Sequence, residues 1–189
     1  MKLLSAVLCA LVFSSGCVTH QPDHFYVLET QPAGVRESRT QFERQVTLRV
    51  TVPSLVDRNE MVLASQNGVV VMDHERWAAP LADLVTATLA RDIEQRRNGV
   101  VVLSKTADHA GIPLVRIAVD IDQIDSRLGS HSTVEAHWRV TDAHTGREIL
   151  GRDTYVSAQL PQSYAAVAAA LSTCLAALAD RLTAEIPAG

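Results

Sequence analysis

The chain has 189 residues, of which 17 are Lys or Arg and 21 are Asp or Glu, so its formal net charge is −4. This acidic balance argues against nucleic acid as a partner, because nucleic-acid-binding domains carry the opposite excess. The length fits one domain with a sizeable core.

Residues 1–16 predict a targeting segment. Lys2 supplies a positive charge, and Leu3–Phe13 is an apolar run of eleven residues. Such a run is too short to span a bilayer, which takes about 20 residues. Small residues follow it, as in a cleaved signal peptide. The sequence therefore predicts export.

Cys17 ends a short motif that resembles a bacterial lipobox, although Ser14 stands where an aliphatic residue is usual. We predict cleavage before Cys17 and lipidation of this cysteine. The alternative is an ordinary secretory signal with an incidental cysteine. By the sorting behaviour of such lipoproteins, Val18 favours the outer membrane, with the domain on the periplasmic face. The predicted organisation is a lipoprotein signal peptide (1–16), a lipidated tether (17–23) and a single domain (24–189).

Alternating apolar residues predict the first strands of the domain. His24–Glu29 is a short candidate strand, and Val46–Val52 alternates with threonine and arginine, which is typical of a strand with one buried face. Pro53 ends this second strand, because proline has no amide hydrogen to donate.

The runs MVLAS and GVVVMD predict a hairpin around Gln66-Asn67-Gly68. Asn-Gly between β-branched runs favours a type I′ turn, in which both central residues have positive φ. An amphipathic helix is expected next, with Pro80 as its first residue and Asn98-Gly99 as its end.

Two motifs around this hairpin resemble those of a known family. The run VPSLVDRNEMV precedes the hairpin and HERWAAPL opens the helix. In this order they resemble the PqiC/YmbA group of ABC-type transport auxiliary lipoproteins, and Phe25-Tyr26-Val27-Leu28 matches the segment after the tether in that family. Asn59 departs from the family pattern, in which proline is common.

The resemblance implies a non-enzymatic accessory of an MCE-type transporter, which moves lipids or other hydrophobic molecules between two membranes. The implied partner is the MCE-domain protein of the same system. The implied role is to receive the periplasmic tunnel at the outer membrane, as a homo-oligomeric ring. The alternative is an independent periplasmic binding or envelope-stability module, similar to the N-terminal domain of TolB.

The second half predicts an antiparallel meander and a long helix. After a short strand at Val100–Leu103, alternation marks strands at Leu114–Ile124, at Val134–Thr141 and near Glu148–Gln159. An alanine-rich helix starts at Pro161 and is stopped by Pro187. The predicted fold class is therefore α/β: a mixed, largely antiparallel sheet with two main amphipathic helices packed on it.

No catalytic motif is present, and we expect no enzyme, cofactor or metal. His131 and His137 lack zinc-site spacing and are interpreted as solvated residues of a sheet face. Asp120, Asp122 and Asp125 are interpreted as surface charges of a strand. Cys174 falls on the apolar stripe of the last helix, which indicates a buried, inert thiol.

The candidate partner interface consists of Asp57, Arg58, His74 and Trp77. Tryptophan and arginine dominate binding hot spots. The favoured alternative is architectural, with Trp77 packed as a lid on the core and Arg58 paired with Asp57 or Glu75.

Overall fold

The computed structural model describes residues 21–33, 43–103, 114–159 and 161–187. The predicted signal peptide, Cys17, and most of the predicted loops at 31–44 and 105–111 lie outside these residues. The described chain forms eight strands and two helices: β1 (His24–Tyr26), β2 (Arg44–Thr51), β3 (Glu60–Ser65), β4 (Gly68–Trp77), α1 (Leu81–Arg96), β5 (Val100–Leu103), β6 (Leu114–Ser126), β7 (Ser132–Asp142), β8 (Glu148–Val156) and α2 (Tyr164–Glu185).

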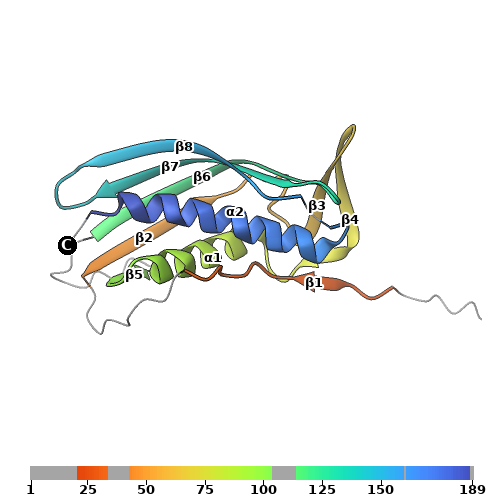
Figure 1. The fold of residues 1–189 in the computed structure, drawn as a ribbon, viewed down its shortest axis with the longest axis horizontal. Helices are drawn as coiled ribbons and strands as arrows, with labels where there is room; N and C mark the ends of the chain where they lie inside the picture. Colours follow the sequence, from red (N-terminus) through yellow and green to blue (C-terminus); the bar gives the residue numbers. More distant parts are fainter. Residues whose placement is uncertain (1–20, 34–42, 104–113, 160, 188–189) are drawn as a thin grey trace, which may run out of the picture.

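The predicted fold class is confirmed, and the strands divide into two sheets. The larger sheet has the order β5-β2-β6-β7-β8, and the smaller has the order β1-β4-β3. In the larger sheet β2 is parallel to both neighbours, whereas β6, β7 and β8 form the expected antiparallel meander. Both helices lie on one face of the larger sheet, and the smaller sheet lies at one end of the molecule (Figure 1).

Period-two alternation decides which face of the larger sheet is buried. The apolar side chains of β6 and β7 point toward the helices, and most of the polar residues between them are exposed or partly exposed. The helices contribute stripes of leucine, isoleucine and valine at helical spacing. These side chains meet in one continuous core, whose largest fully buried members include Leu89, Ile93, Ile117, Leu171, Leu175, Leu178 and Leu182.

Helix α2 is long and apolar enough to cross a membrane, but 61% of its most apolar window is buried inside the protein. This placement is that of a core helix, since α2 packs on β7, β8 and α1. The apolar side chains of α2 are therefore explained by their place in the core of the protein.

The β3–β4 hairpin is confirmed, but its predicted turn type is wrong. Ser65 pairs with Gly68, so the central residues are Gln66 and Asn67, and no described non-glycine residue has a positive φ. Gly68 instead takes φ +140° at the start of β4. Nearer the base, the register between Glu60 and Val62 shifts. This irregularity bends β4 between the hairpin arm and the part that pairs with β1.

The helix starts also differ from the predicted positions. Helix α1 begins one residue after Pro80, and α2 begins at Tyr164 rather than at Pro161. In α2 the cause is local, because the Ser163 hydroxyl accepts a hydrogen bond from the Ala166 amide at 3.2 Å. Such an N-cap satisfies one of the amides that a helix start leaves unpaired.

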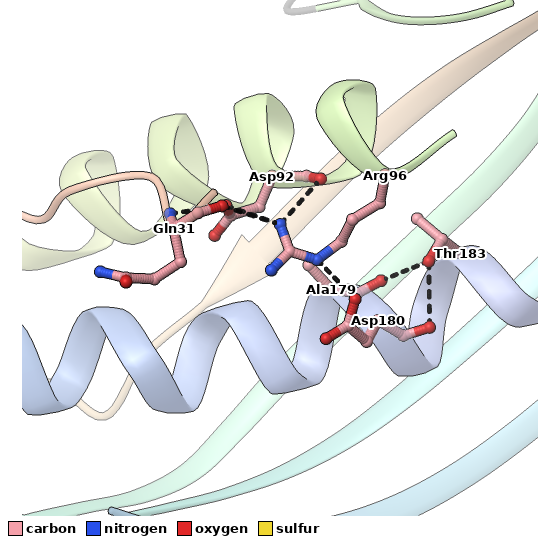
Figure 2. Close-up of polar contacts among 6 residues, drawn as sticks. All are labelled: Gln31, Asp92, Arg96, Ala179, Asp180 and Thr183. Atoms are coloured by element: carbon pink, nitrogen blue, oxygen red, sulfur yellow. Dashed lines mark hydrogen bonds and ion pairs between the residues drawn. The ribbon is translucent and has the colours of Figure 1, made fainter. Parts of the chain in front are cut away.

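A cluster of three charged residues joins the two helices (Figure 2); its Asp92–Arg96 pair within α1 is buried, whereas Asp180 on α2 is 69% exposed. Arg96 Nη1 lies 2.9 Å from Asp92 Oδ1 on α1, and Arg96 Nε lies 2.7 Å from Asp180 Oδ1 on α2. The Gln31 amide also donates to Asp92 Oδ1, at 3.2 Å, which fixes the segment after β1 to the helices. Asp92 is fully buried, and this burial raises its carboxyl pKa although Arg96 acts in the opposite direction. We call Asp92, Arg96 and Asp180 the helix lock.

Candidate partner surface at the small sheet

Trp77, the aromatic member of the predicted interface, is a core residue. It ends β4, and only 3% of its surface is exposed. Its backbone amide donates to the Asn59 carbonyl at 2.6 Å, which ties the end of β4 to the polar corner before β3. The lid interpretation of Trp77 is thereby confirmed, and the side chain is not available to a partner.

Asp57 caps helix α1 from a distant part of the chain. Pro80 occupies the N-cap position and makes no side-chain cap hydrogen bond. Asp57 Oδ1 accepts the Ala82 amide at 3.0 Å, although the two residues are 25 positions apart. A carboxylate at this place satisfies an unpaired amide and interacts favourably with the positive end of the helix. Asp57 therefore has a structural role at an exposed position.

Arg58 and His74 lie at the two ends of one chain of ion pairs and hydrogen bonds beside the small sheet. Arg58 Nε lies 3.0 Å from Glu60 Oε2, and Glu60 Oε1 lies 3.1 Å from Arg76 Nη1. Arg76 Nε lies 3.0 Å from Asp23 Oδ2, whose other oxygen lies 3.1 Å from His74 Nδ1. The predicted pairing of Arg58 with Asp57 or Glu75 is therefore wrong. We call Asp23, Arg58, Glu60, His74 and Arg76 the outer charge chain.

The outer charge chain is partly solvated, since between 27% and 43% of each of its side chains is exposed. The pKa of Glu60 is lowered mainly by a hydrogen bond between its carboxylate and its own backbone, and to a smaller extent by the hydrogen bond from Arg58. Exposed ion pairs of this kind contribute little to folding. Ordered arginines and carboxylates on a surface can instead provide charge complementarity for a partner.

A second polar cluster lies between β1 and the core side of β4. Tyr26 donates its hydroxyl hydrogen to Glu75 Oε2 at 2.6 Å, and His24 Nδ1 lies 3.0 Å from Glu75 Oε1. Burial acts to raise the pKa of Glu75, but the hydrogen bonds from Tyr26 and His24 keep it below its ordinary value. Burial, together with the hydrogen bond to Glu75, raises the pKa of Tyr26 to about 12. This cluster fastens β1 to β4.

The four residues of the predicted interface did not include three members of the outer charge chain, namely Asp23, Glu60 and Arg76. Glu60 and Arg76 meet because the hairpin register shifts next to them. A type I′ turn centred on Asn67-Gly68 would have placed Glu60 opposite Glu75. Asp23, which the sequence assigned to the tether, lies beside His74 because β1 is parallel to β4.

The structure places the other candidate residues in separate surroundings. His131 lies in the β6–β7 turn beside Ser130, whereas His137 on β7 contacts Asp122 at 2.6 Å. Asp120 accepts the Thr51 hydroxyl, and Asp125 faces Arg127 at 3.7 Å. Among the described residues, no group of three His, Cys, Asp or Glu is arranged to hold a metal ion.

Cys174 is buried on α2 as predicted, and it is a free thiol. Burial raises the pKa of the Cys174 thiol to about 11, so the reactive thiolate is disfavoured at neutral pH.

Comparison with known proteins identifies the family. The family model of the ABC-type transport auxiliary lipoprotein component matches residues 26–183. A search of curated proteins finds no match to the chain.

Solved structures share the fold at low sequence identity. The crystal structure of an uncharacterized protein superposes with a TM-score of 0.70 and 18% identity, covering 88% of this chain and 100% of that one. Protein XCC0632 from Xanthomonas campestris, of the DUF330 family, has a TM-score of 0.59 and 16% identity, covering 85% and 92%. Because the family model spans most of the chain, the protein belongs to the ABC-type transport auxiliary lipoprotein family, and the resemblance to PqiC/YmbA proteins is confirmed.

Proposed function

We propose that this protein is a non-enzymatic, lipid-anchored accessory of an MCE-type ABC transport system, positioned at the periplasmic face of the outer membrane. The observation that carries the proposal is the match to the transport auxiliary lipoprotein family over residues 26–183. Family members are membrane-anchored proteins of the cell envelope. In the proposed system, the protein docks the periplasmic tunnel through which lipids or other hydrophobic molecules move between the membranes.

The anchor proposed for this role is acylated Cys17. Replacing it (Cys17→Ala) is expected to release the protein into the soluble periplasmic fraction or to leave its precursor unprocessed. Membrane fractionation and intact-mass measurement of the mature protein distinguish these results from the wild type. Unchanged outer-membrane fractionation together with normal processing would contradict the anchor.

The docking surface proposed for the MCE-domain partner includes the outer charge chain. Arg58 is its most exposed arginine, with 43% of the side chain accessible, and its guanidinium already lies in an ordered ion pair. An arginine held in this way presents a directional set of donors to a partner carboxylate. His74, at the other end of the outer charge chain, is 34% exposed and completes the proposed docking surface.

Co-purification tests this docking surface. Arg58→Glu replaces a donor with an acceptor next to Glu60, so it is expected to weaken capture of the MCE-domain protein, by a factor that reaches tenfold or more where the contact is desolvated. Arg152→Glu on the larger sheet is a control, because Arg152 is 60% exposed and lies outside the outer charge chain. Equal capture by both variants would remove the outer charge chain from the docking surface. Failure of the wild-type protein to capture any component of an ABC system would favour the independent envelope module.

A homo-oligomeric ring is part of the same proposal. A closed ring would present one docking surface per subunit around a common axis, which suits a tubular partner. Native mass measurement of the acylated protein in detergent is expected to give a single closed oligomer. A monomer that nevertheless captures the MCE-domain partner would contradict the ring and leave the docking role intact.

A further inference from the structure

The β3–β4 hairpin carries an unusual surface for a soluble domain. Between Glu60 and Asp73 the chain has no charged side chain, and its tip contains three consecutive valines. All three are exposed, with 47% of Val69, 47% of Val70 and 38% of Val71 accessible. A run of exposed apolar residues of this length is disfavoured in a soluble domain unless it has a function.

Both faces of the hairpin arm are apolar. Side chains alternate along a strand, and Val70 lies with Leu63 and Met72 on the inner face, where they line a groove of about 370 Å³. The groove is completed by Ala64, Ser65 and Gln66 of the hairpin, by Arg127 and Leu128 in the β6–β7 turn and by Tyr164 at the start of α2. Val69 and Val71 alternate with these residues and therefore lie on the outer face. A strand that is apolar on both faces is typical of a strand covered from both sides.

The position of the hairpin relates it to the lipid anchor. The small sheet, which contains β1 and the hairpin, lies at one end of the molecule (Figure 1). His24 of β1 pairs with Glu75 of β4, the strand that also forms the hairpin. Cys17 is seven residues before His24. Seven residues span at most about 25 Å, so the proposed anchor at Cys17 is tied to within about 25 Å of the small sheet that carries the hairpin.

We propose that the tip of the β3–β4 hairpin inserts into the interfacial region of the bilayer that holds the acylated N-terminus. A bilayer can contact both faces of the hairpin at its tip, whereas a protein partner typically covers one face. The bilayer therefore matches the equal exposure of Val69 and Val70 on opposite faces. Apolar surfaces of peripheral proteins enter the interface to a depth of about 5–10 Å, which the uncharged tip permits. The inference rests on the lipid anchor at Cys17 proposed above.

Depth-dependent quenching tests the insertion. The intact acylated protein carrying Val70→Trp is reconstituted into phosphatidylethanolamine–phosphatidylglycerol vesicles that contain phospholipids with brominated acyl chains. The native Trp77 and Trp138 are 3% and 2% exposed and give a constant background. Strong quenching and a blue shift of the emission are expected for the tryptophan at position 70.

Leu150→Trp is the matched control. Leu150 is 62% exposed and lies near the start of β8, away from the β6–β7 turn that contacts the hairpin. Quenching at position 150 is expected to remain at the background level. Equal quenching at positions 70 and 150 would overturn the proposal, and so would a tryptophan at position 70 that responds to a purified MCE-domain partner and not to brominated lipid.

A second variant separates insertion from anchoring. Introducing Val69→Asp and Val71→Asp into the Val70→Trp protein should abolish the quenching, because carboxylates on the outer face oppose entry into the interface. The acyl chains should still keep this variant on floated vesicles. Retained quenching in the charged variant would overturn the insertion alone. A wild-type protein that does not float with vesicles would overturn both the anchor and the insertion.

Discussion

The outer charge chain and the helix lock use the same residue types in opposite environments. In the outer charge chain the arginine and carboxylate side chains are 27–43% exposed. In the helix lock the Asp92–Arg96 pair is buried, with Asp92 fully buried and Arg96 6% exposed, whereas Asp180 is 69% exposed and lies outside this contrast. Water can replace a lost partner in the first case but not in the second. The comparison therefore separates charges that are available to a partner from charges that the fold requires.

Removing the arginine of the helix lock is expected to have the largest effect. Arg96→Met leaves Asp92 buried without its counter-ion and should lower the free energy of unfolding by roughly 3–5 kcal/mol. The double variant Asp92→Leu with Arg96→Leu removes both charges and should recover most of this loss, because matched apolar pairs can replace buried ion pairs. Urea unfolding of the three proteins measures both effects. An Arg96→Met midpoint equal to that of the wild type would mean that the helix lock is as replaceable as a surface pair.

The helix cap supplied by Asp57 should give an intermediate effect. Asp57→Ala removes the acceptor for the Ala82 amide and should cost about 1 kcal/mol, within the range of N-cap substitutions. Asp57→Asn keeps a side-chain oxygen and serves as the control in thermal unfolding. If Ala and Asn destabilise equally, the loss arises from the charge of Asp57 and not from the hydrogen bond.

Neutralising Arg58 is expected to change stability least among the substitutions. Arg58→Met breaks the ion pair with Glu60 at the end of the outer charge chain, and exposed pairs contribute at most about 1 kcal/mol. Chemical unfolding should therefore give a midpoint close to that of the wild type. A loss as large as that of Arg96→Met would place the outer charge chain among the charges that the fold requires.

Acid should distinguish the carboxylates of the small sheet from Asp92 of the helix lock by the direction of their response. The pKa values of Glu60 and Glu75 are lowered by folding, so their contribution to stability is complete above their ordinary pKa of 4.5 and is lost as pH falls through the lowered values. The pKa of Asp92 is raised by burial, so its contribution has the opposite sign and is lost as pH rises.

Amide hydrogen exchange between pH 7 and pH 3 measures this contrast. Amides of β1 and β4 should lose protection at a higher pH than amides of α1 around Asp92. Simultaneous loss of protection in both regions would indicate that global unfolding, rather than the local carboxylates, controls the acid response.

Sequence patterns alone predicted much of the secondary structure and the family. Period-two alternation located β6, β7 and β8, and helical spacing located α1 and α2, because burial of one face imposes these periods on any sequence. The burial of Cys174 followed from the helical pattern, whereas the burial of Trp77 was favoured because large aromatic residues lie in cores more often than at interfaces. The runs VPSLVDRNEMV and HERWAAPL carried the family resemblance, which the family model confirms.

Tertiary structure decided the features that depend on register and on distant partners. The sequence could not show that Asp57 caps a helix that begins at Leu81, because the two residues meet only when the chain folds back. Nor could the sequence show why position 151 requires glycine. A Cβ there would lie 2.1 Å from the ring of Trp138 on the neighbouring strand. The register shift in the hairpin brings Glu60 to Arg76 rather than to Asp73, where the register of the hairpin arm would have placed it. Local propensity fixes the elements, whereas side-chain partners are set by strand order and register, which only the packed core selects.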